Sequence, residues 1–221
     1  MSGQIAYSVR RSPRSRRIKV RVDPHHGVEV LLPRRAALRE AAAAVDQLTD
    51  WIAAEQARLA AARQRLSPPG TLPYLDERLL VVPDPSRGTT ARRKPGNVLA
   101  VPASPLAATA AIERFYRRAA RAEIARRLDA ATTATATSYT SLTIRNQRTR
   151  WASCARGGAM SFNWRLMLAP ERVLDYVVWH EVCHLRHADH SPAFWRMLGE
   201  HDPRYRDAAA WLRENGVALV V

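Results

Sequence analysis

The chain has few cysteines, very little lysine and no long apolar run. Cys154 and Cys183 are its only cysteines, too few for a disulfide framework, so we expect a cytoplasmic protein with reduced thiols. No window approaches the roughly 18 uncharged apolar residues of a membrane span. The basic N-terminal segment is not followed by an apolar stretch, so no secretory signal is expected. The sequence also lacks a G-x-x-x-x-G-K-[ST] loop and an acidic cluster for magnesium, which argues against an ordinary nucleoside triphosphatase.

Positive charge is abundant instead, and it is unevenly distributed. The net charge is +15 and the sequence pI is about 11.2. Residues 1–35 carry nine basic and two acidic side chains, residues 101–157 carry ten and three, and residues 158–221 carry seven and eight. Such a field favours contact with nucleic acid, nucleotides or another polyanion. An arginine-rich codon bias would give the same composition, since only two of the 35 basic residues are lysine.

The pattern of apolar residues predicts an α+β fold with a small sheet and helices packed on one side. Segments 17–22 and 28–32 alternate around a turn and predict a hairpin. The alanine-rich segment 36–66 predicts one helix. The remaining expected elements are strands at 78–82 and 97–101, a loop at 83–96, a helix at 105–131, a link at 132–138, extended segments at 140–147, 150–154 and 159–166, and helices opened by Pro170, Pro192 and Pro203.

Two regions are expected from this order of elements. Residues 1–103 would form an N-terminal β-rich lobe with a long helix. Residues 104–221 would form the catalytic core. The hydrophobic content of 47% is enough for a substantial core in either arrangement.

The segment HEVCHLRHADH, residues 180–190, has the spacing of a metal site. Residues four apart lie on one face of a helix, so His180 and His184 can direct their imidazoles at one ion. Glu181 lies about 100° further round the helix, where it can reach a metal-bound water without being a ligand. The apolar residues 173–179 supply the buried helix that such a site needs.

A catalytic zinc requires a third protein ligand and an open position for water. His190 is expected to supply it, provided that the chain turns after His187. The sequence permits that turn, because Ser191 and Pro192 resemble the cap and first turn of a new helix. Glu200 is the alternative third ligand.

Other residues near the motif have several possible roles. His187 could be a surface residue, a group that supports a ligand or contacts substrate, or itself a ligand. Cys183 is expected to be a small buried core residue. His25, His26 and His201 have no partner at ligand spacing, so we expect them to face solvent.

Several blocks of the chain resemble the YgjP-like metallopeptidase domain. They are RNQRTRWASC (145–154), MSFNWRLMLAP (160–170), LDYVVWHEVCHLRHADHSPAFW (174–195) and the basic segment from Arg10 to Pro33. The histidine pattern is also similar to that of WLM and SprT-like proteases, which act on proteins attached to DNA. The resemblance implies a zincin-like fold, one zinc ion on His180, His184 and His190, and a general base at Glu181. Ala152 departs from the family pattern, which usually has glycine there.

These observations predict a zinc-dependent metallopeptidase with possible nucleic-acid contact. The oxyanion would need a donor, for which His187, Tyr205 and Arg150 are candidates. Residues 159–165 are expected to offer a strand edge to an extended peptide, with Asn163, Trp164 and Arg165 along the cleft, unless Trp164 is core and Arg165 is solvated.

The alternative activity is hydrolysis of nucleoside triphosphates to release pyrophosphate, which has been described for some similar proteins. A non-catalytic nucleic-acid binder with structural zinc is a third possibility, against which Glu181 argues.

Overall fold

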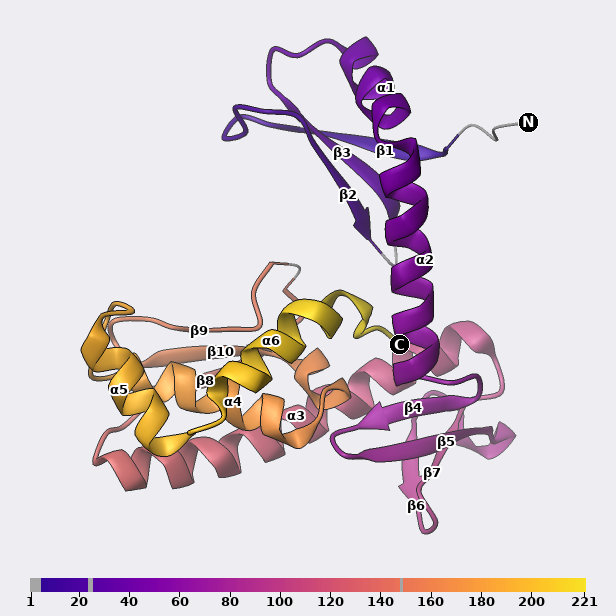
Figure 1. The fold of residues 1–221 in the computed structure, drawn as a ribbon. Coiled ribbons are helices and arrows are strands. Elements are labelled where there is room, and N and C mark those ends of the chain that lie inside the picture. The colour runs from indigo at the N-terminus through magenta and orange to yellow at the C-terminus, as the bar shows by residue number, and fades with distance from the viewer. Residues whose placement is uncertain (1–4, 24–25, 148) are drawn as a thin grey trace. The chain divides into compact units, whose positions relative to one another are not determined.

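The computed structural model describes residues 5–23, 26–147 and 149–221. Contacts divide the chain into two compact units, one extending to Arg65 and the other running from Leu66 to Leu219 (Figure 1). The boundary expected near residue 104 stays a prediction, because a compact unit is defined by contacts and a domain by independent folding. None of the described helices combines the length and apolar character that a membrane span requires.

The first unit is a three-stranded sheet covered by helices. Strands β1 (Tyr7–Ser12), β2 (Lys19–Asp23) and β3 (Gly27–Pro33) lie in the order β1-β3-β2. Strand β3 pairs in antiparallel fashion with β2, which confirms the hairpin, although Pro24 and His25 of its turn lie outside the described residues. Alternate residues Val28, Val30 and Leu32 pack against helix α1 (Leu38–Gln47) and the start of α2 (Thr49–Leu66).

The prediction of a single helix over 36–66 is wrong, because the helix is interrupted at Leu48. That residue has φ −108° and ψ 15°. The Thr49 hydroxyl donates to the carbonyls of Val45 and Asp46, a local bond that competes with the backbone ladder. Val45 and Ile52 remain buried on either side of the break, whereas Leu48 is exposed.

The second unit begins with a four-stranded sheet in the order β4-β5-β7-β6. Its strands are β4 (Thr71–Tyr74), β5 (Glu77–Pro83), β6 (Arg92–Lys94) and β7 (Val98–Val101), with a short 3-10 turn at Pro85–Arg87. The segment 83–96 was expected to be only a loop and contains β6. Gly96 and Asn97 both have positive φ, which lets β6 and β7 form a tight hairpin.

Helix α3 (Pro105–Thr135) runs four residues further than predicted. The hydroxyls of Thr132, Thr133 and Thr135 donate to carbonyls one turn back, so the threonines are accommodated within the helix. The helix ends where Ala136 adopts a left-handed conformation with φ 46°.

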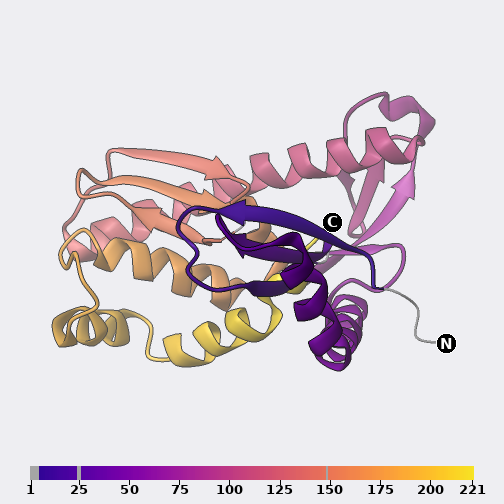
Figure 2. The same cartoon turned by 90° about the horizontal axis from the view of Figure 1, so that it is seen from above.

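A second three-stranded sheet and three helices complete this unit. Strands β8 (Ser141–Arg145), β9 (Ala152–Cys154) and β10 (Ala159–Asn163) lie in the order β8-β10-β9. A 3-10 segment (Trp164–Leu168) leads to α4 (Glu171–Cys183), and α5 (Pro192–His201), α6 (Tyr205–Asn215) and a last 3-10 turn (Gly216–Ala218) follow. Helix α4 contacts α3, β9, α5 and α6, and in Figure 2 it lies between the β8-β10-β9 sheet and the α5–α6 pair.

The core around α4 is closed by large buried side chains. Tyr116 of α3 stacks on Trp164, and both are almost fully buried. Arg127 of α3 is only 6% exposed and binds Glu123 of its own helix together with Glu171 and Asp175 of α4. These contacts fix the first turns of α4 against α3.

Candidate metal centre

The first two histidines lie at the C-terminal end of α4, and the apolar sequence of this segment favours a buried helix. It begins directly after Pro170 and buries Val173, Leu174, Val177 and Val178. The helix ends at Cys183, so His184 is its C-terminal cap and keeps a helical conformation, with φ −68° and ψ −14°. His180 and His184 therefore lie one turn apart on one face, as their spacing predicts.

The chain turns immediately after the helix and returns His190 to the same place. The amides of Arg186 and His187 both donate to the Cys183 carbonyl, which closes the turn. The Asp189 carboxylate then accepts the amide of Ser191, and α5 begins at Pro192. The helix start at Pro192 is confirmed, whereas the helix breaks earlier than predicted, after Cys183 and not after His187.

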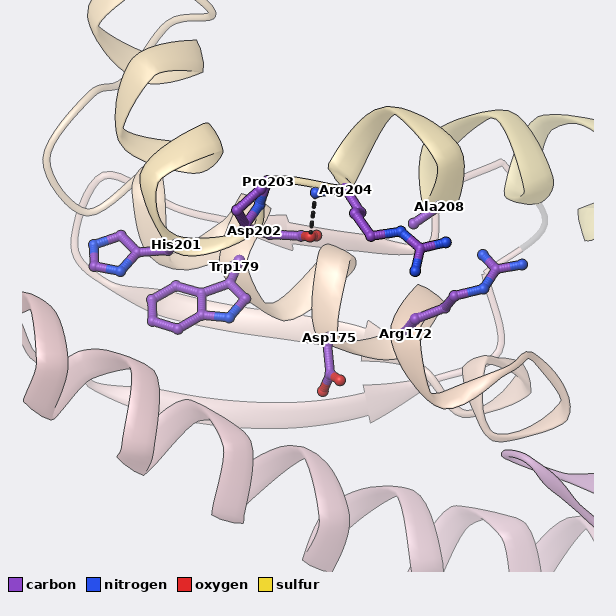
Figure 3. A pocket seen from close by; sticks show the side chains of 8 residues that line it. All are labelled: Arg172, Asp175, Trp179, His201, Asp202, Pro203, Arg204 and Ala208. Carbon is purple, nitrogen blue, oxygen red and sulfur yellow. Dashed lines mark hydrogen bonds between the residues drawn. The ribbon is translucent and has the colours of Figure 1, made fainter.

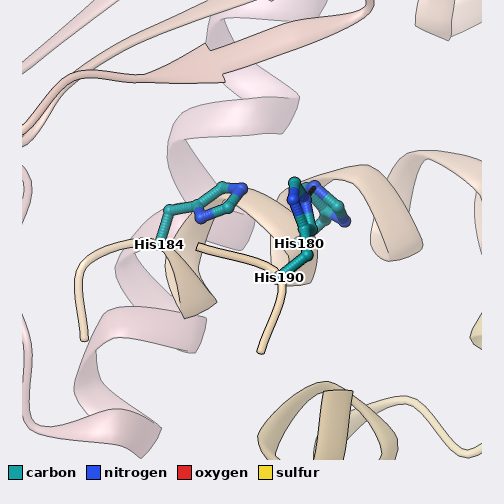
Figure 4. Close-up of side chains that lie close together, drawn as sticks. All are labelled: His180, His184 and His190. Carbon is teal, nitrogen blue, oxygen red and sulfur yellow. Dashed lines mark hydrogen bonds between the residues drawn. The ribbon is translucent and has the colours of Figure 1, made fainter. Parts of the chain in front are cut away.

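The three imidazoles converge (Figure 4). One ring nitrogen from each of His180, His184 and His190 lies within 4.8 Å of the other two. The Nε2 atoms of His180 and His190 are 3.0 Å apart. Two nitrogens bound to a tetrahedral zinc at about 2.0–2.1 Å would be separated by about 3.3 Å. The three side chains thus fit a single ion with little movement. Within the described part of the chain, the cluster consists of these three histidines and does not include Glu200, the alternative third ligand.

A hydrogen bond orients the His184 ring. Its Nδ1 donates to the backbone carbonyl of His187 at 3.0 Å, which leaves Nε2 with a free lone pair. His187 thus supports a neighbouring histidine through its backbone, a contact that side-chain spacing alone does not indicate. The Nδ1 atom of His180 is buried and has no hydrogen-bond partner among the described residues.

Burial sets the ionisation of the cluster. It lowers the pKa of His180 to about 4, with His184 and His190 adding to the effect. Burial also lowers the pKa of His190. These shifts favour neutral imidazoles, the form that binds a metal ion.

Glu181 is on the side of α4 that faces β9. It is 6% exposed, and the backbone amide of Cys154 donates to its carboxylate. Burial raises the pKa of Glu181 to about 7, although the Cys154 bond opposes the rise. A carboxyl group with this pKa can accept and release a proton near neutral pH.

Two aromatic residues of α5 were not identified from the sequence. Phe194 is fully buried, and its ring centroid lies 4.7–4.9 Å from those of all three histidines. Trp195 stacks on His190 at 5.5 Å and on Tyr205 at 5.6 Å. No sequence signal identifies them, because their contact with the histidines depends on how α5 packs on α4.

The expected substrate edge is misplaced. Strand β10, which covers most of 159–165, is the central strand of its sheet, so its backbone is already paired on both sides. Trp164 belongs to the core. Asn163 is 2% exposed, and its side-chain amide donates to the Gln147 carbonyl. The outer strand next to α4 is β9. Ala152 lies in this strand with no positive φ, so the backbone there does not require the family's glycine.

The other expected residues are dispersed. Cys183 is buried beside Phe194 and Leu198, as predicted. His26 is exposed, whereas His201 stacks face to face on Trp179 at 4.5 Å and does not simply face solvent. Arg150 is exposed ahead of β9.

Helix α3 lies in the basic segment 101–157, and several of its arginines are bound to other groups of the chain. Arg127 is buried in its carboxylate network, so it cannot contact a polyanion. Arg117 and Arg126 pair with glutamates of the same helix, and Arg121 donates to the Leu142 carbonyl. In the first unit, by contrast, the basic side chains of 14–21 are exposed: Arg14, Arg16, Arg17, Lys19 and Arg21.

Comparison with known proteins identifies the family of the chain. No curated protein sequence matches the chain. One solved structure that resembles it is the crystal structure of the metallopeptidase zymogen of Pyrococcus abyssi abylysin, with 19% identity and a TM-score of 0.35 over 41% of this chain and 93% of that one. The family model of the YgjP-like metallopeptidase domain matches residues 16–215. Since that match covers nearly the whole sequence, the chain belongs to the YgjP-like metallopeptidase family.

Proposed function

We propose that the chain is a zinc metallopeptidase that holds one ion on His180, His184 and His190 and uses Glu181 as its general base. The observation that carries the proposal is the convergence of three imidazoles beside a buried carboxylate on the same helix. Three histidine nitrogens are a donor set typical of catalytic zinc, which keeps its fourth position for water. When bound, the ion would acidify a water molecule and polarise the peptide carbonyl.

Glu181 would take the proton released by the attacking water and pass it to the leaving amine. Its location supports this role, because it adjoins the ligands in sequence without belonging to their cluster. The Cys154 amide holds its carboxylate in one orientation. Burial keeps bulk water away, which strengthens the interactions that a proton transfer depends on.

We further propose that an extended substrate lies along the outer edge of β9. The Trp151 carbonyl accepts the Asn163 amide and the Ala155 amide donates to the Ala159 carbonyl, so these residues bond inward to β10. Hydrogen bonding alternates along an antiparallel pair, so the backbone groups of Ala152 and Cys154 point outward. The Cys154 amide contacts Glu181, which places this edge beside the proposed base. A peptide added there would lie next to the histidines.

Metal content and hydrolysis, measured on the same preparations, test the assignment. We expect about one zinc per chain, its loss in His180→Ala and His190→Ala, and its retention in Glu200→Ala. Glu181→Gln should keep the metal and lose cleavage of casein or of quenched peptides. The same proteins should be assayed with nucleoside triphosphates. Nucleotide hydrolysis without peptide cleavage would replace the peptidase assignment, and full activity of Glu181→Gln would remove its role as base.

A further inference from the structure

A cavity lies beside α4, and its lining includes none of the three histidines. It has a volume of about 390 Å³ and is lined by residues of α4, α5, α6 and the turn before α6: Arg172, Asp175, Trp179, His201, Asp202, Pro203, Arg204 and Ala208 (Figure 3). This volume is in the range of about 300–1,000 Å³ that is typical of small-molecule sites. The metal proposal gives this cavity no role.

The cavity has an apolar wall and two sets of charges. Trp179 and His201 stack with an interplanar angle of 3°, which gives one flat wall. In Figure 3 the Asp202 carboxylate lies between this ring pair and the side chains of Arg172 and Arg204, which approach one another on the other side. Ala208, near the start of α6, also lines the cavity, and its side chain is too small to fill it.

Asp202 has an unused acceptor. One carboxylate oxygen accepts the Arg204 amide at 3.2 Å, while Oδ2 is buried with no hydrogen-bond partner among the described residues. A buried charged oxygen without a donor is unfavourable, so its presence calls for a missing partner. Asp175 differs, because Arg127 Nε already binds it at 2.6 Å. Asp202 is therefore the lining carboxylate that lacks a cation.

The two arginines are the matching positive groups. Arg204 has only a 3.4 Å contact with Asp207, and both side chains are largely exposed, so this pair contributes little. Arg172 has no ion pair within the described part of the chain. Two adjacent guanidinium groups suit a ligand carboxylate, which can accept several N–H bonds at once.

We propose that this cavity binds a small zwitterion of the amino-acid class. The ligand ammonium would donate to Asp202, its carboxylate would lie between Arg172 and Arg204, and an apolar side chain would pack against the Trp179–His201 wall. Both ligand charges then meet an opposite charge that is unpaired or only weakly paired, so the cavity selects against molecules that have only one of them. Free amino acids are products of peptide hydrolysis, but the assignment depends on the cavity alone.

Isothermal titration calorimetry with L-phenylalanine tests the proposal on the protein as purified. Parent protein should bind phenylalanine, and N-acetylphenylalanine and phenylalanine amide, which each lack one charge, should bind at least about tenfold more weakly. Asp202→Asn and the double variant Arg172→Ala/Arg204→Ala should show the same loss. Arg196→Ala, an exposed arginine of α5 outside the cavity, is the matched control and should bind as the parent does.

Amino acids also chelate zinc, so His180→Ala is needed to separate the two sites. Binding that persists in His180→Ala and disappears in Asp202→Asn supports the cavity, whether or not the protein proves to be a peptidase. Binding lost in His180→Ala and kept in Asp202→Asn would place phenylalanine at the metal and overturn the proposal. It is equally overturned if parent protein does not bind phenylalanine, or if N-acetylphenylalanine binds as tightly.

Discussion

Replacing Arg127 by methionine should destabilise the unit that carries the metal centre by about 2–4 kcal/mol. The guanidinium is 6% exposed and binds Glu123, Glu171 and Asp175, which are 26%, 48% and 43% exposed. Breaking a buried ion pair costs about 3–5 kcal/mol when the remaining charge stays buried. Here the three carboxylates can be rehydrated, which reduces the cost, and methionine preserves much of the packing of the aliphatic stem.

The loss should be visible as a fall in melting temperature of about 4–16 °C, at roughly 2–4 °C per kcal/mol for a chain of this size. Because the chain has two compact units, a single transition cannot be assumed. Tryptophan fluorescence in a Trp51→Phe background reports only on the second unit, since the other tryptophans are at 151, 164, 179, 195 and 211.

The matched control is Arg126→Met, one residue earlier on the same helix. Arg126 pairs with the same Glu123, but its side chain is 63% exposed, so its loss should change stability by less than about 0.5 kcal/mol. The reasoning would be refuted if Arg127→Met cost no more than Arg126→Met. It would also be refuted if 0.5 M salt removed the difference, because a buried pair is poorly screened.

Three further predictions follow from other contacts. Trp195→Ala should weaken zinc binding about tenfold in a chelator competition, because the indole holds the exposed His190 ring, while Trp195→Phe should retain most of the affinity; equal affinities would contradict this. Gly216→Ala should cost about 1–3 kcal/mol, since its new Cβ would lie 2.8 Å from the Trp151 ring, whereas Gly199→Ala, with its nearest contact at 3.7 Å, should not; melting curves decide. Charge reversal of the exposed basic residues 14–21 should abolish salt-sensitive binding of a labelled oligonucleotide, whereas reversal of Arg126 should leave it intact; unchanged binding would rule out the nucleic-acid contact expected from the charge of this segment.

The convergence of the three histidines could be predicted from sequence because it depends on local geometry. His180 and His184 are fixed by helical periodicity, and the turn before His190 is indicated by Ser191 and Pro192. The position of β10 could not be predicted in the same way. Strand order depends on pairing between β8, β9 and β10, and the apolar pattern of a short strand does not show whether it is central or outermost.

For other features the sequence contains a relevant signal, but a stronger pattern points to a different structure. Leu48 fits the apolar spacing of a continuous helix, yet the Thr49 hydroxyl bonds interrupt it. Gly96 and Asn97 are typical turn residues, but the β6–β7 hairpin that they connect is not predicted, because β6 is short and basic and has no apolar pattern. The arginines of α3 show the limit of charge counting, since the sequence does not reveal that Arg127 turns inward to Glu171 and Asp175.

The proposed metal site and the proposed base are supported by different parts of the chain. Residues 180–195 contain all three histidines and the Phe194 and Trp195 rings against them, so the proposed metal site is assembled by α4, the turn and α5. Glu181 instead depends on β9, through the Cys154 amide. Trp151 immediately precedes β9, and Gly216 packs on its ring. Displacing Trp151 should therefore lower peptide turnover while zinc content stays near that of the parent. Parallel loss of zinc and turnover in Gly216→Ala would show that the two functions share one support.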